Sequence, residues 1–270
     1  MRNAKRHLLT AVLVLGALAM VFPFLWTVIT SLTSGAGLAA TPSLIPEDPS
    51  LDAYRTLFGK STFGRAVLNS VGLAVVITAI QIITSALAAY AFSRFEFPGK
   101  RLAFAAYLGT MMIPMQVLLV PLFVQMKNLG LINNFGGVIL PSAASAFGVF
   151  LLRQAMASVP RELDEAATID GAGHLRVFAR IVMPNVTPAI ATFGVFAFMS
   201  SWNAFLWPLV ILRQDHLKTL PLALASLQGQ FTTQWDVMMA GSVISILPML
   251  ALYIFAQRYI IQGVAGSGLK

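Results

Sequence analysis

Few residues in this chain have the types and spacing that support catalysis or metal binding. The chain contains no cysteine, so thiolate metal sites, cysteine nucleophiles and disulfides are excluded. Its three histidines, His7, His174 and His216, lie far apart and form no ligand-spaced pair. Residues 59–61 (Gly-Lys-Ser) match the end of a phosphate-binding loop, but Tyr54 stands where the first glycine of that loop is required. The sequence therefore predicts neither nucleotide hydrolysis nor metal chemistry in this chain.

Neutral polar residues inside apolar stretches are the remaining candidates for binding a small molecule. Their amide groups and indole rings offer hydrogen bonds and an aromatic face to a solute rich in hydroxyl groups. These residues are Asn69, Gln81, Gln116, Trp202, Asn203 and Trp207. Hydrogen bonding between helices and an aromatic belt at the membrane surface account for the same residues. The sequence favours these structural roles and leaves a solute path as the alternative.

Charged residues gather in one segment, residues 153–185, which cannot lie in lipid. Pro160 suits the first position of a helix, and the acidic residues at 162, 164 and 165 place negative charge at the positive end of the helix dipole. Gly171 can adopt the left-handed conformation that stops a helix. We therefore expect a helix of about two turns between Pro160 and Gly171.

One face of this helix suits contact with another protein. Leu163, Ala166, Ala167 and Asp170 recur at the three-and-four spacing of a helical face. Small alanines beside an acidic residue let a partner approach the backbone closely. The helix is thus predicted to be a docking projection.

A second short helix is predicted after the break at residues 171–173. Leu175, Phe178 and Val182 form an apolar stripe at helical spacing, and the stripe ends at Pro184. We expect this amphipathic helix to cross the first one at an angle.

The elements that position this segment are apolar helices. Hydrophobic residues make up 57% of the 270 residues and charged residues only 10%, whereas soluble domains carry about a quarter charged residues. Six charge-free stretches approach or exceed the roughly 20 residues needed to cross a hydrocarbon core. They are residues 8–32, 66–93, 102–126, 136–152, 186–212 and 237–257. The predicted fold is an all-α membrane protein of six transmembrane helices, one transmembrane domain over residues 1–270, with a helical loop at 153–185 between helices 4 and 5.

Two of these stretches contain prolines that break helices. Pro114 and Pro141 are expected to interrupt the third and fourth stretches near the middle of the membrane. The fourth stretch is short, so we expect its helix to continue past Arg153, whose side chain can reach the membrane surface.

The positions of Lys and Arg predict how the chain is oriented. With the N-terminus inside, twelve of the 18 basic residues lie on the cytoplasmic side, and both termini are cytoplasmic. The apolar stretch at 8–32 exceeds the hydrophobic region of a signal peptide, so a retained helix is favoured. The net charge of +8 is scattered beside apolar runs, and we interpret it as an orientation signal rather than as nucleic-acid binding.

The external connection at residues 33–65 is long enough to carry function. Pro42, Pro46 and Pro49 argue against a helix in its first part. Apolar residues then recur at helical spacing over 51–58, which predicts a short helix at the membrane surface. A contact with a partner and a packed connector are both open for this segment.

The 160–184 segment resembles the cytoplasmic signature loop of permeases in ATP-binding-cassette importers. The family pattern is Glu-Ala-Ala, three residues, Gly, nine residues, Ile, one residue, Leu, Pro. The matching residues here are Glu165, Ala166, Ala167, Gly171, Ile181 and Pro184. The departure is Met183 in place of Leu, a substitution of similar volume.

Weaker matches extend the resemblance over nearly the whole chain. They lie at residues 52–58, 69–70, 89–95, 201–208 and in the tail from Gly263. Together they resemble the smaller permease subunit of carbohydrate importers of the maltose and glycerol-phosphate type. The resemblance implies a sugar or related polyol or sugar phosphate as solute, and a bacterial inner-membrane location.

The resemblance also implies a mechanism and a set of partners. Expected partners are a second permease, two ATPase subunits that use ATP and Mg²⁺, an extracytoplasmic solute-binding protein and membrane lipid; no cofactor and no nucleic acid are expected on this chain. Glu165 would meet a basic residue of the ATPase, Ala166 and Ala167 would fill a shallow pocket, and Gly171 would permit the turn. Asp170, Ile181 and Pro184 belong to the same coupling set.

Two other classes of protein are alternatives to an importer subunit. A proton-driven secondary transporter usually employs intramembrane carboxylates or histidines, which the predicted spans lack, while sodium sites made of backbone carbonyls stay open. An intramembrane enzyme lacks support because no metal-spaced histidines or catalytic triad are visible. Neither of these two classes explains the charged segment at residues 153–185.

Overall fold

The computed structural model describes residues 2–33, 49–59, 61–228 and 234–265, and within these ranges the chain is mostly helical and contains no strand. The chain divides into two compact units. One comprises residues 1–65 and 220–248, and the other residues 66–219 and 249–270. The predicted all-α class is confirmed, while the single domain over 1–270 stays a prediction.

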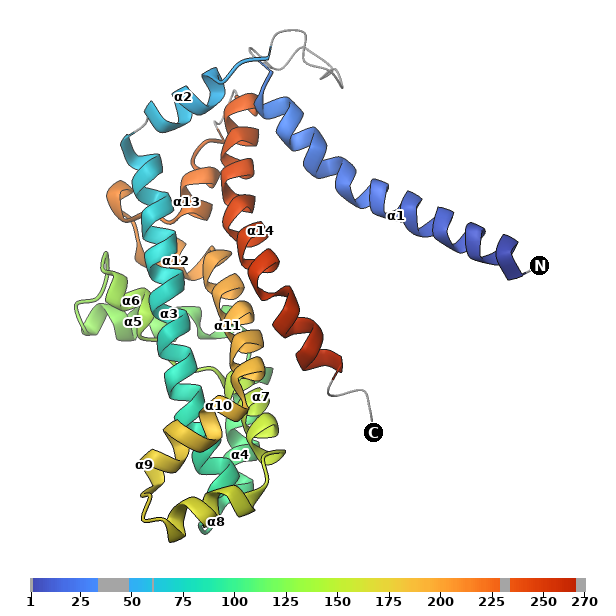
Figure 1. Ribbon diagram of the computed structural model, residues 1–270. Helices are drawn as coiled ribbons and strands as arrows, with labels where there is room; N and C mark the ends of the chain where they lie inside the picture. Colours follow the sequence, from blue (N-terminus) through green and yellow to red (C-terminus); the bar gives the residue numbers. More distant parts are fainter. Residues whose placement is uncertain (1, 34–48, 60, 229–233, 266–270) are drawn as a thin grey trace. The chain divides into compact units, whose positions relative to one another are not determined.

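Figure 1 labels the elements along the chain. The helices are α1 (Arg2–Ser31), α2 (Asp52–Gly59), α3 (Ser61–Arg94), α4 (Lys100–Gly109), η1 (Thr110–Met112), α5 (Met115–Asn128), α6 (Phe135–Ile139), α7 (Ala146–Ala157), α8 (Arg161–Ile169), α9 (His174–Val177), η2 (Phe178–Val182), α10 (Met183–Asn185), α11 (Thr187–Trp202), α12 (Leu206–Ile211), η3 (Asp215–Leu217), α13 (Leu220–Ala225) and α14 (Trp235–Ala265).

Three single helices in the described ranges are long and apolar enough to cross a membrane. They contain Leu9–Ser31, Thr62–Arg94 and Trp235–Gln257, and so match the first, second and sixth predicted spans. Two bent helix pairs qualify only if each pair counts as one span. The count of six spans therefore stays a prediction.

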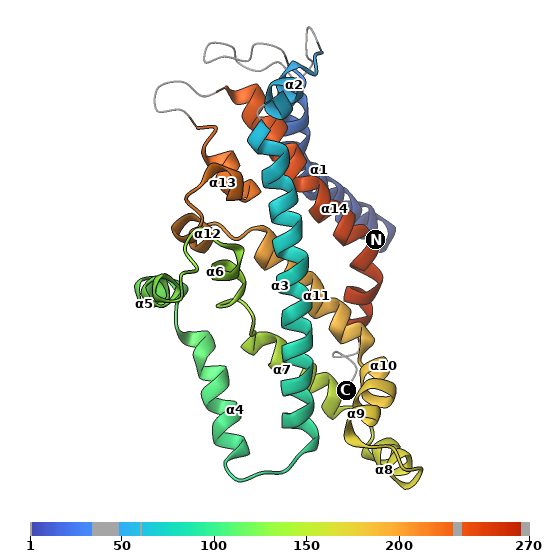
Figure 2. The ribbon, with the colours of Figure 1, turned by 90° about the vertical axis from the view of Figure 1, so that its left-hand side faces the viewer.

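The third predicted span, 102–126, is bent rather than straight. Helix α4 continues through η1 and then meets α5 at an angle of 99°, and Figure 2 shows the change of direction. The break falls at Pro114, as predicted, because proline lacks an N–H and pushes the preceding residue toward an extended backbone. Ile113 has this backbone, with φ −86° and ψ 113°.

The fourth predicted span, 136–152, is interrupted around Pro141, as predicted. Helix α6 ends at Ile139 and α7 begins only at Ala146. Pro141 has no N–H to donate to the carbonyl of Gly137, four residues earlier. That carbonyl instead accepts a hydrogen bond of 3.0 Å from Trp207 Nε1. The predicted continuation past Arg153 is confirmed, because α7 runs to Ala157.

The fifth predicted span, 186–212, is also interrupted. Helix α11 ends at Trp202 and α12 begins at Leu206. The ring of Pro208 would clash with the carbonyl of Ala204 in a continuous helix, so the chain turns at residues 203–205. At the other end, α11 meets the helical segment before it at 80°.

The unit of residues 1–65 and 220–248 contains the helix predicted at 51–58. It is α2, and Tyr54 OH lies 2.8 Å from Ser31 Oγ at the end of α1. Phe58 meets Phe63 edge to face, with ring centroids 5.6 Å apart. Pro42 and Pro46 lie outside the described residues.

The other unit has its core where α3, α7 and α11 pack together. Gly148 on α7 makes this close approach possible. A Cβ atom at residue 148 would overlap the ring of Phe193 and lie 2.6 Å from Ser85 Oγ. Buried side chains of the same core continue into α9 and η2 through Val177 and Val182. The segment of residues 158–185 is therefore packed onto the helices rather than loosely attached.

Candidate functional site

The predicted docking helix is α8, which begins at Arg161 and ends at Ile169. Pro160 precedes the helix with an extended backbone, one position earlier than predicted. Gly171 has φ 80°, which confirms the predicted left-handed stop. The amide of Ala172 donates to the carbonyl of Ala167 across this turn at 2.9 Å.

The predicted second helix is present as α9, η2 and α10, with three differences. Residues 178–182 form a π-helical turn, a wider turn of a kind frequent at functional sites. Leu175 does not belong to the buried stripe, because 79% of its surface is exposed. Val177 takes the buried position instead. The helical segment ends at Asn185, so Pro184 lies inside its last turn.

The motif residues divide between an outward face and an inward one. Glu165, Ala166 and Asp170 are exposed. Ala167 and Ile181 are partly buried and pack against the core. Ile169 is 87% exposed, which adds an apolar side chain to this face that the motif does not predict. Pro184 is exposed as well.

An ion pair fixes α8 to the end of α3. Arg94 Nε lies 2.7 Å from Asp164 Oδ2, with 7% of the Arg94 side chain and 18% of the Asp164 side chain exposed. Arg94 Nη2 also donates to the carbonyl of Val159 at 3.1 Å. Sequence reasoning missed this pair because it treated Arg94 as an orientation signal, and no pattern joins residues 70 positions apart.

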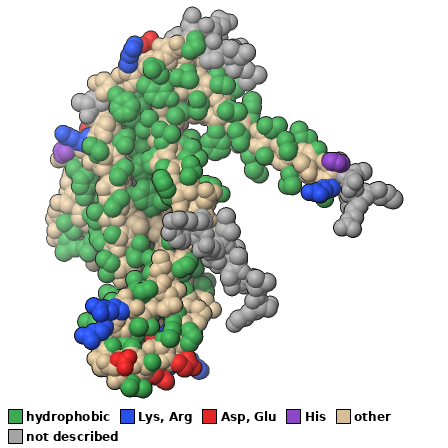
Figure 3. Space-filling model, in the orientation of Figure 1, with side chains coloured by type: hydrophobic (Ala, Val, Ile, Leu, Met, Phe, Trp, Pro, Cys, Tyr) green, Lys and Arg blue, Asp and Glu red, His purple; other side chains and the backbone are tan. Residues whose placement is uncertain are grey.

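Further hydrogen bonds attach the segment to α3. Arg161 Nη2 donates to the carbonyl of Ser93 at 3.2 Å, and Tyr90 OH donates to the carbonyl of His174 at 3.3 Å. Figures 1 and 2 both show α8 and α9 beside the end of α3. Charged side chains gather around this end in Figure 3, whereas the face over α3 is largely hydrophobic. These contacts therefore hold α8 against the end of α3 and leave its other side exposed.

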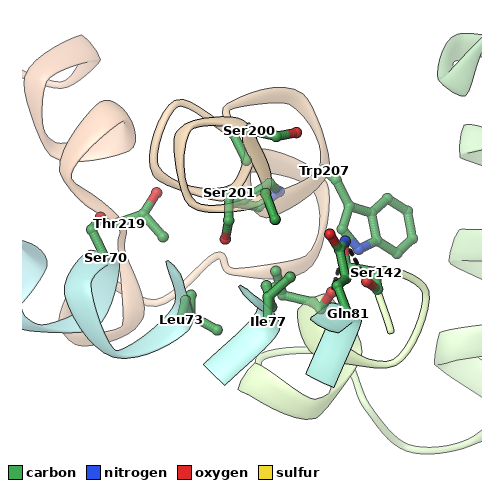
Figure 4. Close-up of a pocket in the computed structure, with 13 residues that line it drawn as sticks. Ser70, Leu73, Ile77, Gln81, Ser142, Ser200, Ser201, Trp207 and Thr219 are labelled. Atoms are coloured by element: carbon green, nitrogen blue, oxygen red, sulfur yellow. Dashed lines mark hydrogen bonds between the residues drawn. The ribbon is translucent and has the colours of Figure 1, made fainter. Parts of the chain in front are cut away.

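A polar cavity of about 90 Å³ lies between α3, α6, α11 and α12. Figure 4 shows its hydroxyl and amide groups: Ser70, Gln81, Ser142, Ser200, Ser201 and Thr219. Every residue of the lining is uncharged. Gln81 Nε2 donates to the carbonyl of Ser142 at 2.7 Å. Ser201 Oγ and Thr219 Oγ1 are buried without a hydrogen-bond partner among the described residues.

Of the six residues considered for a solute path, Gln81 lines this cavity. Asn69 Nδ2 donates to the carbonyls of His216 and Lys218, both at 3.0 Å. Trp202 is buried and stacks on Phe198, and Asn203 Nδ2 donates to the carbonyl of Met199 in the helix that precedes it, α11. Gln116 is exposed on α5. Trp207 also lines the cavity. The serine and threonine hydroxyls were missed, because such residues are common and only the fold brings these together.

A multi-pass helical membrane protein with a rigidly supported helical projection is the class that the fold and the site define. Within that class, the chain belongs to the family of binding-protein-dependent transport system inner membrane components, whose model matches residues 81–266. The family consists of transport permeases, not enzymes.

Curated relatives match over nearly their full length. The chain is 36% identical to the arabinooligosaccharides transport system permease protein AraQ of Halalkalibacterium halodurans, covering 94% of this chain and 92% of the relative. It is 34% identical to the lactose transport system permease protein LacG of Rhizobium radiobacter, covering 95% and 94%. It is also 34% identical to the sn-glycerol-3-phosphate transport system permease protein UgpE of Pectobacterium atrosepticum, covering 94% of each chain.

A solved structure agrees with these relatives. A chain in the crystal structure of a bacterial ABC transporter involved in the import of the acidic polysaccharide alginate superposes with a TM-score of 0.86. The two chains are 25% identical, and the match covers 96% of this chain and 98% of that one. This protein is therefore a permease subunit of an ATP-binding-cassette importer, and the alternative of a secondary transporter finds no support.

Proposed function

We propose that this permease forms half of an import path for a sugar or a related polyol or sugar phosphate, and that α8 couples the path to a separate ATPase. The observation that carries the coupling role is the exposed face of α8, held against α3 by the buried Arg94–Asp164 pair. The relatives named for arabinooligosaccharides, lactose and glycerol phosphate support the solute class.

The coupling surface consists of the exposed part of the signature loop. Glu165 faces a basic residue of the ATPase, and Ala166 with Asp170 allows close approach of its surface. Ala167 and Ile181 pack the loop against its own core, and Gly171 and Pro184 shape its turns. ATP and Mg²⁺ bind to the ATPase, so this chain supplies no catalytic group.

Force reaches the membrane helices through the anchors of α8. The Arg94–Asp164 ion pair and the Arg161–Ser93 hydrogen bond join α8 to the end of α3. Closure of two ATPase subunits would therefore move α8 and α3 together as a rigid body. A second permease subunit and an extracytoplasmic binding protein complete the importer.

The orientation follows from the same proposal. The loop of residues 153–185 lies in the cytoplasm of the bacterium, together with both termini, and residues 1–270 form one permease domain with six spans. The inner membrane surrounds this domain.

The uncharged cavity between α3, α6, α11 and α12 belongs to the solute path. Gln81 and the hydroxyls of Ser201 and Thr219, which have no partner among the described residues, suit the hydroxyl groups of a carbohydrate. Asn69, Gln116, Trp202 and Asn203 stay in the proposed path, although the hydrogen bonds of Asn69 and Asn203 also suit a structural role.

Two substitutions in the loop test the coupling role. We expect Glu165→Lys to repel the ATPase and Gly171→Asp to disturb the turn, so that uptake stops while ATP hydrolysis is uncoupled or the ATPase is lost. Glu162→Lys is the matched control, because it makes the same charge change on the same helix, at an exposed position outside the motif. Normal uptake by both loop variants would refute the proposal.

A further inference from the structure

A basic cleft lies beside the turn between α3 and α4, separate from the coupling surface and the polar cavity. It has a volume of about 800 Å³, and its cations are Lys100, Arg101, Arg153 and Arg161. Glu96 is the acidic residue of its lining. Four positive charges thus face one negative charge, which favours an anion in the cleft.

The cations in the cleft are only partly neutralised by the protein. Lys100 Nζ lies 3.0 Å from Glu96 Oε1, and Arg161 Nη2 lies 3.8 Å from the same oxygen. The hydrogen bond from Lys100 lowers the pKa of the Glu96 carboxyl below its usual value. Among the described residues, Arg101 and Arg153 make no ion pair.

Arg153 is held in place but keeps hydrogen-bond donors free. Its Nε donates to the carbonyl of Phe92 at 3.2 Å, and its guanidinium lies 4.3 Å from the centroid of the Phe104 ring. This contact fixes the plane of the guanidinium, so its terminal nitrogens are preorganised for a bidentate contact with a phosphate.

The N-terminus of α4 adds a second attraction for an anion. Gly99, in the left-handed conformation with φ 77°, precedes the helix, and no described side chain caps it. Both Gly99 and Lys100 line the cleft. The positive end of the helix dipole therefore coincides with the cluster of cations.

The surroundings of the cleft indicate a lipid rather than a soluble phosphate. The cleft lies where the apolar run Thr62–Arg94 ends and the bent pair Lys100–Asn128 begins, which is the level of the head groups. Leu102, at the rim, is 75% exposed, and no residue of α4 is buried. An acyl chain can lie along α4 while the phosphate lies among the arginines.

We propose that this cleft binds the head group of an anionic phospholipid such as phosphatidylglycerol. Arg101 and Arg153 contact the phosphate, and the apolar surface of α4 contacts an acyl chain. The cleft shares Ser93 and Arg161 with the anchors of α8, whereas Arg101 and Arg153, which contact the phosphate, lie outside the coupling surface.

Native mass spectrometry of the full chain, purified in mild detergent with any subunits that accompany it, tests the proposal. After incubation with equal amounts of phosphatidylglycerol and phosphatidylcholine, we expect the protein to retain phosphatidylglycerol preferentially. Loss of each arginine in Arg101→Gln and Arg153→Gln should weaken this preference about fivefold, the equivalent of about 1 kcal/mol per cation. Lys127→Gln is the matched control, because it removes one exposed cation at the other end of the α4–α5 pair.

Four results would overturn the proposal. Equal retention of both lipids would show that the cleft has no preference for an anionic head group. An equal effect of Lys127→Gln would show a general effect of charge. Displacement of the lipid by inorganic phosphate would identify a soluble anion as the occupant, and loss of the lipid on addition of the ATPase would identify a protein surface. If the Arg153→Gln variant does not fold, two measurements still test the proposal. They are the retention of the two lipids by the wild-type protein and the effect of Arg101→Gln at its exposed position.

Discussion

The signature loop of residues 160–185 and the polar cavity use polar side chains in opposite ways. In the loop, ionised groups fix the segment to α3 through the Arg94–Asp164 pair, and the motif residue Glu165 is exposed. In the cavity, every lining group is neutral, and the hydroxyls of Ser201 and Thr219 are buried without a partner in the part of the chain that the structure describes.

This contrast follows from the cost of charge in different surroundings. Ionised groups are expensive inside a membrane, so they are confined to its edge, where partners and water compensate them. A neutral hydroxyl can be buried at lower cost and can form a hydrogen bond with a solute. The loop is suited to transmitting force, and the cavity is suited to transient binding.

Breaking the ion pair of the loop should have the largest effect. Arg94→Met leaves Asp164 largely buried without its cation, so we expect a loss of about 3 kcal/mol or more in the stability of the attached loop. The measurement is protease cleavage within residues 158–175, together with ATP-driven uptake. Arg176→Met is the control, because Arg176 is exposed and makes no ion pair within the described ranges. Cleavage and uptake equal to the wild type would contradict the anchoring role.

A side chain added at a tightly packed glycine in the interior should lower the stability of the protein. Gly148→Ala forces a methyl group against Phe193 and Ser85, which should cost about 1–3 kcal/mol. Thermal unfolding in detergent measures this loss. At Gly72 on α3 an added Cβ meets nothing within 4 Å, so Gly72→Ala should leave the unfolding temperature unchanged or raise it. Equal unfolding temperatures for both variants would show that the helices do not pack as described.

Gly171 in the loop should matter because of its backbone conformation and not because a side chain there would lack space. A Cβ at Gly171 meets nothing within 4 Å, but φ is +80°, so Gly171→Ala should cost about 1–2 kcal/mol. Gly173→Ala, also in open space but with φ −73°, is the matched control. Limited proteolysis of the loop compares the two. If Gly173→Ala made the loop more sensitive to protease than Gly171→Ala does, the expected effect of the backbone conformation would be contradicted.

The smallest change in stability is expected for the hydroxyls of the cavity. Ser201→Ala and Thr219→Val remove no hydrogen bond between described residues, so stability should change by less than about 1 kcal/mol, while uptake of the solute should fall. Thr192→Val removes a hydroxyl that is bonded to the carbonyl of Pro188 and lies outside the cavity lining. It should lower stability and spare uptake. Unchanged uptake in the cavity variants would exclude these hydroxyls from the solute path.

Local patterns predicted much of this fold. The long apolar runs give α1, α3 and α14, and the lack of an N–H at Pro114 explains the bend between α4 and α5. Gly171 has the predicted left-handed backbone. These features depend on neighbouring residues, which a sequence displays directly.

Features that join distant residues could not be predicted. The Gly137 carbonyl is satisfied by Trp207, 70 positions away, and the Arg94–Asp164 pair spans the same distance. The cavity depends on several helices that bring ordinary serines and a threonine together. The signature motif could be found in the sequence because its residues lie within one short segment, whereas the groups that anchor the segment do not.

The proposed function requires that α8 docks on an ATPase at the cytoplasmic side. Because the chain has no cysteine, Ile169→Cys and Arg55→Cys give single labels on α8 and α2. We expect a membrane-impermeant maleimide to label residue 55 in intact cells and residue 169 only in inverted vesicles, with the label at 169 blocked by the ATPase. Labelling of residue 169 from outside, or labelling that the ATPase leaves unchanged, would contradict the account.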